Sequence, residues 1–179
     1  MKHFFKGIFV LLSFLIVSCT KLPPQTIQGT WQNERTVRTD LLSNPEDENS
    51  VFARFDTRQK IVYEFLPDGT FVKTISESFV KVIPVKEEIQ IDDDLILKLK
   101  STGGEFSVLG TFKVDRQKIH LFPQFVNLNG IENIAFSYAL EQNPAIKKER
   151  ADLNYTLHPA TLYLQSEDGT LDAFSAQEN

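Results

Sequence analysis

The fold is decided by the stretch IVYEFLPDGTFVKTI, residues 61–75. Ile61, Tyr63 and Phe65 occupy every second position, which places them on one face of an extended strand. The next segment is PDG at residues 67–69, where proline presets φ for a chain reversal and glycine accepts a positive φ. Apolar residues then resume at Phe71 and continue to residue 75. The stretch therefore predicts a β-hairpin with one apolar face.

Apolar alternation and tight turns recur on both sides of this hairpin. Turn signals occur at residues 92–94, 102–104, 115–117, 158–160 and 167–169. Between them, strands are predicted at residues 29–38, 79–85, 88–91, 95–99, 106–114, 118–122, 153–157, 162–164 and 170–174. Gly110 falls at an inward position, where it leaves a gap or bends the strand, as a closing barrel often needs. Pro123 is expected to end the strand before it.

Two segments depart from this pattern. Residues 41–50 contain Asn44-Pro45 and several acids, and we interpret them as a solvated loop. Residues 131–142 fit helical spacing through Ile131, Ile134 and Tyr138, but their apolar residues fit strand spacing equally well. Both interpretations stay open for this segment, with the strand slightly favoured.

The predicted elements define the fold class. Eight to ten strands joined mostly by tight turns predict an all-β fold, an antiparallel up-and-down meander that closes into a barrel, with one short helix possible at 131–142. Closure removes the exposed strand edges that otherwise promote aggregation. We assign the barrel domain to residues 29–174 and a frayed tail to residues 175–179.

The first residues of the chain predict export. Lys2 and Lys6 precede an apolar run at residues 7–17, which is the layout of a secretory signal peptide. Spanning a bilayer takes about 20 apolar residues, so a permanent transmembrane helix is not expected. We therefore expect residues 1–18 to be removed. Residues 19–28, which contain Pro23-Pro24, would then form an extended tether.

The segment Ile16-Val17-Ser18-Cys19 resembles the lipobox of bacterial lipoproteins. The resemblance implies that Cys19 becomes the lipidated first residue of the mature protein. Acyl chains such as palmitate would then anchor the protein in a membrane of the bacterial cell envelope, stably if there are two or more. The alternative is an ordinary signal peptide followed by an unrelated cysteine. Because Cys19 is the only cysteine in the chain, an internal disulfide is excluded.

The charge balance restricts the partners of the mature chain. Removing Lys2 and Lys6 from the 19 basic residues leaves 17 against 24 acidic ones, a net charge of about −7. An acidic body argues against nucleic acid and against electrostatic docking on anionic lipid headgroups. The link to the bilayer would therefore be the acyl chains on Cys19.

Four patches resemble the lipocalin-like domains found in many bacterial lipoproteins. They are IQGTW at 27–31, YEFLPDGTF at 63–71, GTFKV at 110–114 with IHL at 119–121, and YTL at 155–157 with LYL at 162–164 and DG at 168–169. The resemblance implies an eight-stranded antiparallel barrel with Trp31 packed at its base. Larger lipocalins commonly pair that tryptophan with a late arginine, but no arginine follows Arg150 in this chain.

An eight-stranded barrel is just wide enough to be filled by side chains or to hold one small ligand. The candidates for its inner, ligand-binding face are Tyr63, Phe65, Phe71, Phe106 and Phe112, so an occupant would be apolar or amphipathic. The same residues could instead fill a solid core. The leading prediction is a membrane-anchored, noncatalytic barrel that binds or shields a small hydrophobic molecule in the cell envelope.

The alternative function is a protein-interaction module with a solid core, which docks onto an envelope complex or a host molecule through the loops at 41–50 and 127–149. Catalysis has little support, because the mature chain holds only His120 and His158 and lacks a nucleophile elbow or phosphate loop. The acids at 46–48 lack the spacing of a calcium loop, and those at 92–94 are interpreted as a solvated turn. No metal or cofactor is therefore expected.

Overall fold

The computed structural model describes residues 26–44, 46–101 and 103–177. The predicted signal peptide, Cys19 and most of the tether lie outside these residues. The described residues form nine strands: β1 (Gly29–Leu42), β2 (Val51–Phe65), β3 (Thr70–Pro84), β4 (Gly104–Asp115), β5 (Lys118–Leu128), β6 (Ile131–Ala135), β7 (Asp152–His158), β8 (Thr161–Gln165) and β9 (Leu171–Ala176). They also form the helices α2 (Asp93–Lys100) and α3 (Phe136–Gln142) and the 3-10 helix η1 (Pro144–Glu149).

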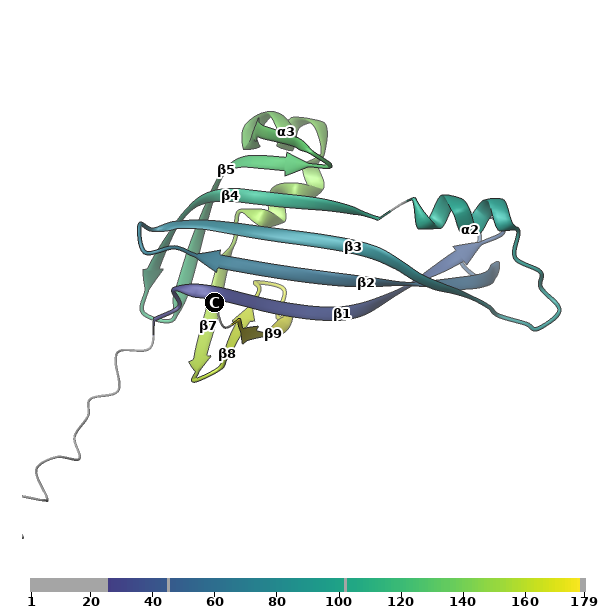
Figure 1. The fold of residues 1–179 in the computed structure, drawn as a ribbon, viewed down its shortest axis with the longest axis horizontal. Helices are drawn as coiled ribbons and strands as arrows, with labels where there is room; N and C mark the ends of the chain where they lie inside the picture. The colour runs from purple at the N-terminus through teal and green to yellow at the C-terminus, as the bar shows by residue number, and fades with distance from the viewer. Residues whose placement is uncertain (1–25, 45, 102, 178–179) are drawn as a thin grey trace, which may run out of the picture.

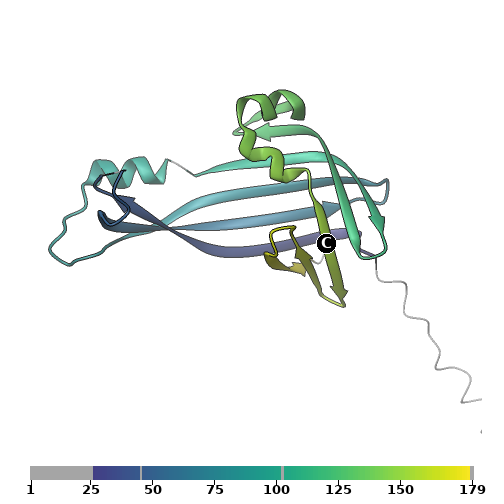
Figure 2. The same cartoon turned by 180° about the vertical axis from the view of Figure 1, so that it is seen from behind.

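The strands form one antiparallel sheet that closes on itself (Figure 1; Figure 2). Their order is β4-β3-β2-β1-β9-β8-β7-β5-β6, and pairing of β4 with β5 completes an eight-stranded barrel. The remaining strand, β6, pairs with the end of β5 at residues 125–128, whereas residues 118–120 of β5 pair with β7. The predicted all-β fold, an antiparallel meander closed into a barrel, is confirmed, and it is consistent with a lipocalin-like fold.

Aromatic side chains fill the barrel toward the end where β1 begins. Tyr63 and Phe65 of β2 and Phe71 of β3 are each at most 5% exposed. The ring of Phe174 from β9 meets Tyr63 edge-on, with the centroids 5.3 Å apart, and Phe112 from β4 meets Phe65 in the same way at 5.0 Å. Burial of each such side chain contributes roughly 1.5–3 kcal/mol. These contacts therefore form an aromatic core that joins β4, β2 and β9 across the inside of the barrel.

Trp31 lies at the base, which we define as the end of the barrel where the tether enters. Its side chain is 5% exposed, and the indole Nε1 donates to the carbonyl oxygen of Ile27 at 2.8 Å. Ile27 is equally buried and belongs to the same core cluster. The backbone of the tether thus satisfies the buried indole N–H in a chain that has no late arginine.

The backbones of β4 and β5 approach each other closely at Gly110. A Cβ atom at this position would overlap the carbonyl oxygen of Phe122 and lie 2.9 Å from Pro123 Cα. Gly110 pairs with Pro123, and Gln124 is an extra residue that makes a β-bulge in β5. Proline is tolerated at such a bulge, so the strand continues through it and the prediction that it ends there is wrong. Gly110 leaves no gap but allows the two strands to meet.

The strands β1, β2 and β3 continue past the barrel as an arm (Figure 1). The arm consists of residues 36–42, 51–58 and 78–84, with α2 beside it. β4 pairs with β3 as far as Glu77, and β9 pairs with β1 at Trp31 and Gln32. Among the described residues, backbone pairing within the arm is therefore confined to β1, β2 and β3.

Charged side chains of β1 and β2 form ion pairs across one face of the two strands, in the arm and in the adjoining part of the barrel. The pairs are Arg38–Asp56 at 2.7 Å, Arg54–Asp40 at 2.8 Å and Arg58–Glu34 at 3.2 Å. The hydrogen bond from Arg38 lowers the pKa of the Asp56 carboxyl, although burial opposes this shift. These pairs help to set the register of β1 and β2, because opposite charges face each other across the ladder.

Helix α2 replaces one of the predicted strands, at residues 95–99, and residues 88–91 also lie outside any strand. The side chain of Asp92 caps the helix by accepting a hydrogen bond from Asp94 N at 3.1 Å. Leu99 is buried, whereas Leu97 is 62% exposed. Both strand predictions are therefore wrong, since the aspartates begin a helix. α2 contacts β3. β3 continues past Glu77, the last of its residues that pairs with β4. The predicted strand at 79–85 corresponds to the end of β3.

Residues 131–142 contain both a strand and a helix, so each of the two open interpretations holds for one half. β6 ends at Ala135 and α3 begins at Phe136, which is 2% exposed and packs with Val126 and Ile146. α3 lies over the barrel wall formed by β4 and β5 (Figure 1). We call β6, α3 and η1, residues 131–149, the cap. No helix in the described part of the chain is long and apolar enough to cross a bilayer.

Candidate functional site

An apolar pocket of about 500 Å³ lies between the cap and strands β3, β4 and β5. We call it the cap pocket. Its volume is in the range of small-molecule sites, which combine an apolar wall with a few polar groups. The polar groups are Gln142, Asn143, Lys148 and Glu149. The apolar wall includes Ile75, Phe106, Val126, Ile134, Tyr138 and Ile146.

The local sequence explains how the cap is held over the barrel. Asn143 follows α3, and its side chain accepts a hydrogen bond from Ala145 N at 3.1 Å. Asn143 is thus the N-cap residue of η1, and Pro144 occupies the first helical position, so η1 starts immediately after α3. Ile146 of η1 is 8% exposed and packs against Phe136 of α3. The two short helices therefore form one unit around a shared apolar contact.

The five aromatic residues predicted for ligand contact lie at different levels of the barrel. Phe106 lines the cap pocket. Tyr63, Phe65 and Phe71 are buried in the core, and Phe112 packs against it. The cavity beside Tyr63 measures about 70 Å³, which is room for water rather than for an organic ligand. The structure thus brings one of the five to the cap pocket and packs the other four below it.

A buried ion pair separates the cap pocket from this small cavity. Lys73 Nζ on β3 donates to Glu149 Oε2, the last residue of η1, at 2.5 Å. The Lys73 side chain is 15% exposed and the Glu149 side chain 2%. Glu149 lines the cap pocket, whereas Lys73 lines the 70 Å³ cavity and lies over the ring of Tyr63. The pair therefore connects the cap to the inside of the barrel wall.

The lysine of this pair is charged at neutral pH. Burial alone lowers the pKa of Lys73, but its interactions with Tyr63 and Glu149 outweigh burial and leave the pKa raised above its usual value. Neither Lys73 nor Glu149 was predicted as a site residue from the sequence. Lys73 could have been found, because it occupies an inward position between Phe71 and Ile75 in the alternating strand. Glu149 has no comparable signal, since η1 is too short to show a period.

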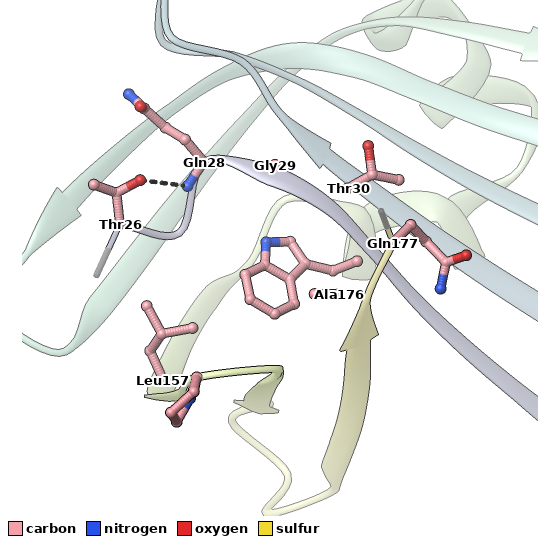
Figure 3. Close-up of a pocket in the computed structure, with 9 residues that line it drawn as sticks. Thr26, Gln28, Gly29, Thr30, Leu157, Ala176 and Gln177 are labelled. Carbon is pink, nitrogen blue, oxygen red and sulfur yellow. Dashed lines mark hydrogen bonds between the residues drawn. The ribbon is translucent and has the colours of Figure 1, made fainter. Parts of the chain in front are cut away.

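A second pocket, of about 270 Å³, lies at the base of the barrel (Figure 3). The tether residues Thr26 and Gln28 line it together with Leu157 and the C-terminal residues Ala176 and Gln177. Thr26 Oγ1 accepts a hydrogen bond from Gln28 N at 3.2 Å, which turns the chain into β1. Its lining contains no ionisable side chain. Trp31, Leu157 and Pro159 give this base pocket an apolar side, but the pocket lacks a charged group such as Glu149 of the cap pocket.

The two histidines among the described residues, His120 and His158, lie apart. His120 Nδ1 is hydrogen-bonded to Asp152 Oδ1 at 2.8 Å at the start of β7, and His158 at the end of β7 meets the ring of Tyr163 edge-on. In the ranges that the structure describes, no group of three or more His, Cys, Asp or Glu side chains is placed to hold a metal ion. Neither histidine lines the cap pocket.

No protein-family model matches the chain, and no curated protein matches it. The class of this protein is therefore defined by its fold and its pocket. It is a closed eight-stranded antiparallel β-barrel with an apolar pocket beneath a short helical cap.

Proposed function

We propose that this protein is a noncatalytic binding protein that holds a small apolar or amphipathic molecule in the cap pocket. The observation that carries this proposal is the cap pocket itself, with its volume of about 500 Å³ and its apolar wall. Leu128 and Tyr138 line it and are 45% and 58% exposed. An occupant would remove this apolar surface from water, which favours binding.

We further propose that the barrel is anchored in the bacterial cell envelope through acyl chains on Cys19. Support for this part comes from the resemblance of residues 16–19 to a lipobox, which lies outside the described residues. Cys19→Ala should move the protein from the membrane fraction to the soluble fraction and abolish incorporation of labelled palmitate. Unchanged partition would contradict the anchor and leave the cap pocket unaffected.

Titration with the apolar fluorophore N-phenylnaphthylamine tests ligand binding. We expect saturable binding at one site per mature chain. Ala139→Phe places a ring inside the cap pocket and should weaken binding about tenfold or more. Ala173→Phe is the matched control, because Ala173 is exposed on β9 and does not line the cap pocket. Equal binding by the two variants would refute the proposed site.

A second candidate function is the interaction module, and the arm favours it. β1 has a backbone edge from residue 33 to 42 that β9 does not pair in the described structure, and such an edge can accept a strand from a partner. A photoreactive residue at Thr39 should then form one defined adduct in intact envelopes. The same probe at Ser175, on β9, is the control. The absence of an adduct specific to Thr39 would remove this candidate.

A further inference from the structure

We infer that the cap pocket selects amphiphiles whose polar end donates hydrogen bonds, an alcohol or a protonated amine, over amphiphiles that end in a carboxylate. This inference rests on the proposed function, because it names the headgroup class that the cap pocket accepts. It follows from the position of a buried carboxylate at a mainly apolar surface.

Glu149 is the buried charged residue in the lining of the cap pocket. Its side chain is 2% exposed, and its Oε2 accepts from Lys73. A carboxylate has two oxygens and about four acceptor sites. One hydrogen bond from Lys73 therefore leaves acceptor capacity for a donor that enters from the pocket. Hydrogen bonds to a charged acceptor are among the stronger ones in proteins.

The ammonium of Lys73 is placed on the far side of this carboxylate. Lys73 lines the 70 Å³ cavity together with Tyr63 and Asp172, and it does not line the cap pocket. A ligand carboxylate would face the like charge of Glu149. Alternatively, it would have to displace Glu149 from Lys73 and leave a buried charge without its partner. Both routes disfavour an anionic headgroup at the inner end of the cap pocket.

The other polar residues of the cap pocket do not reverse this preference. Lys148 is exposed, so solvent screens its attraction for an anion. Gln142 and Asn143 are neutral amides and discriminate little by charge, and Asn143 Oδ1 already accepts from Ala145 N. The selection by charge is therefore set by Glu149.

Decanol, decylamine and decanoate share one chain length and differ in the headgroup. Each is used to displace N-phenylnaphthylamine from the full mature chain. We expect decanol and decylamine to displace the probe at concentrations about tenfold or more below that of decanoate. Glu149→Gln should remove the advantage of decylamine over decanoate, because it leaves Lys73 without a counter-charge. Asp172→Asn, a carboxylate of the small cavity that pairs with Arg35, should preserve that advantage.

A second variant guards against failure of Glu149→Gln to fold. Lys73→Met/Glu149→Leu removes both charges and keeps similar volumes, and it should retain binding of the probe while losing the preference among headgroups. Decanoate that binds as tightly as decylamine to the native chain, while Ala139→Phe still blocks the probe, would overturn the headgroup inference alone. If the probe and all three decyl compounds fail to bind, both the inference and the proposed cap-pocket function are overturned.

Discussion

Gly110→Ala tests whether the barrel closes through direct contact between the backbones of β4 and β5. A Gly→Ala substitution at an unstrained position with free space stabilises a protein by about 0.4–1 kcal/mol, because it restricts the unfolded chain. At Gly110 the added methyl would overlap the carbonyl oxygen of Phe122 and lie 2.9 Å from Pro123 Cα. These are backbone atoms of the neighbouring strand, which cannot rotate away. We therefore expect the opposite sign, a loss of stability.

The contact distances set the size of the effect. Carbon atoms pack best at about 3.5–4.0 Å, and the overlap with the carbonyl oxygen of Phe122 is the tightest contact, so β4 and β5 would have to separate by roughly one ångström or more. Such overpacking costs about 1–3 kcal/mol, and weakening one or two ladder hydrogen bonds beside the bulge adds about 0.5–1.5 kcal/mol each. The free energy of unfolding should fall by about 1.5–6 kcal/mol in total. For a domain of this size, that lowers the melting temperature by about 3–24 °C.

Urea denaturation measures this loss, with the fluorescence of the buried Trp31 as the probe. Gly130→Ala is the control, because Gly130 has φ +85° and a Cβ there would meet nothing within 4 Å. This control should cost about 1–2 kcal/mol from backbone strain alone. The reasoning is refuted if Gly110→Ala is as stable as the native chain, or if it is less destabilised than Gly130→Ala.

Three further predictions concern the buried ion pair and α2. Glu149→Leu alone should lower the free energy of unfolding by about 3–5 kcal/mol because Lys73 stays buried without its partner, whereas Lys73→Met/Glu149→Leu should cost much less in the same urea assay. Stability should also fall as pH rises above about 10. Burial raises the pKa of Tyr63, and the pKa of Lys73 is raised as well, so the native state keeps these protons longer than the unfolded chain does. The contribution of Tyr63 and Lys73 to stability is complete below the pKa values of the unfolded chain, and it is lost as pH rises through their raised pKa values in the native state. Urea midpoints that stay constant as pH rises above about 10 would contradict this prediction. Asp92→Ala removes the cap of α2 and should cost about 1 kcal/mol locally, seen as faster amide exchange at residues 93–100 but not in β2.

Most barrel strands could be predicted because each faces the core on one side and solvent on the other. The sequence predicts two separate strands in place of β3, because residues 76–78 are polar. In the structure, Glu77 lies opposite Gln59 and accepts a hydrogen bond from Thr57 at 2.6 Å. Polar residues of β2 and β3 therefore contact one another at this level of the sheet, and they interrupt the alternation of apolar residues along β3. The strand is continuous because backbone pairing with β2, rather than apolar alternation, holds it there.

The helix α2 shows where periodicity fails. Apolar residues at 95, 97 and 99 alternate as in a strand, and eight residues are too few to separate a period of 2 from a period of 3.6. The end signals were more informative, with Asp92 before the helix, acids in its first turn and Lys98 and Lys100 in its last turn. The cap pocket could not be predicted at all, because it depends on how the cap folds back over strands that are distant in sequence.

Composition could not distinguish a solid barrel from a ligand-binding one, and the structure explains why. A packed core and a pocket wall occur at different levels of the same strand. On β3, Phe71 lies in the core, whereas Ile75, two residues after Lys73 and on the same face, lines the cap pocket. Ile75 and Phe106 line the cap pocket and also pack against the core, but the other residues that line the pocket do not belong to the core cluster. Binding and stability should therefore be separable in this barrel. Ala139→Phe should lose the fluorophore while its urea midpoint stays close to that of the native chain. A variant that loses both together would indicate that the cap and the core form one packing unit.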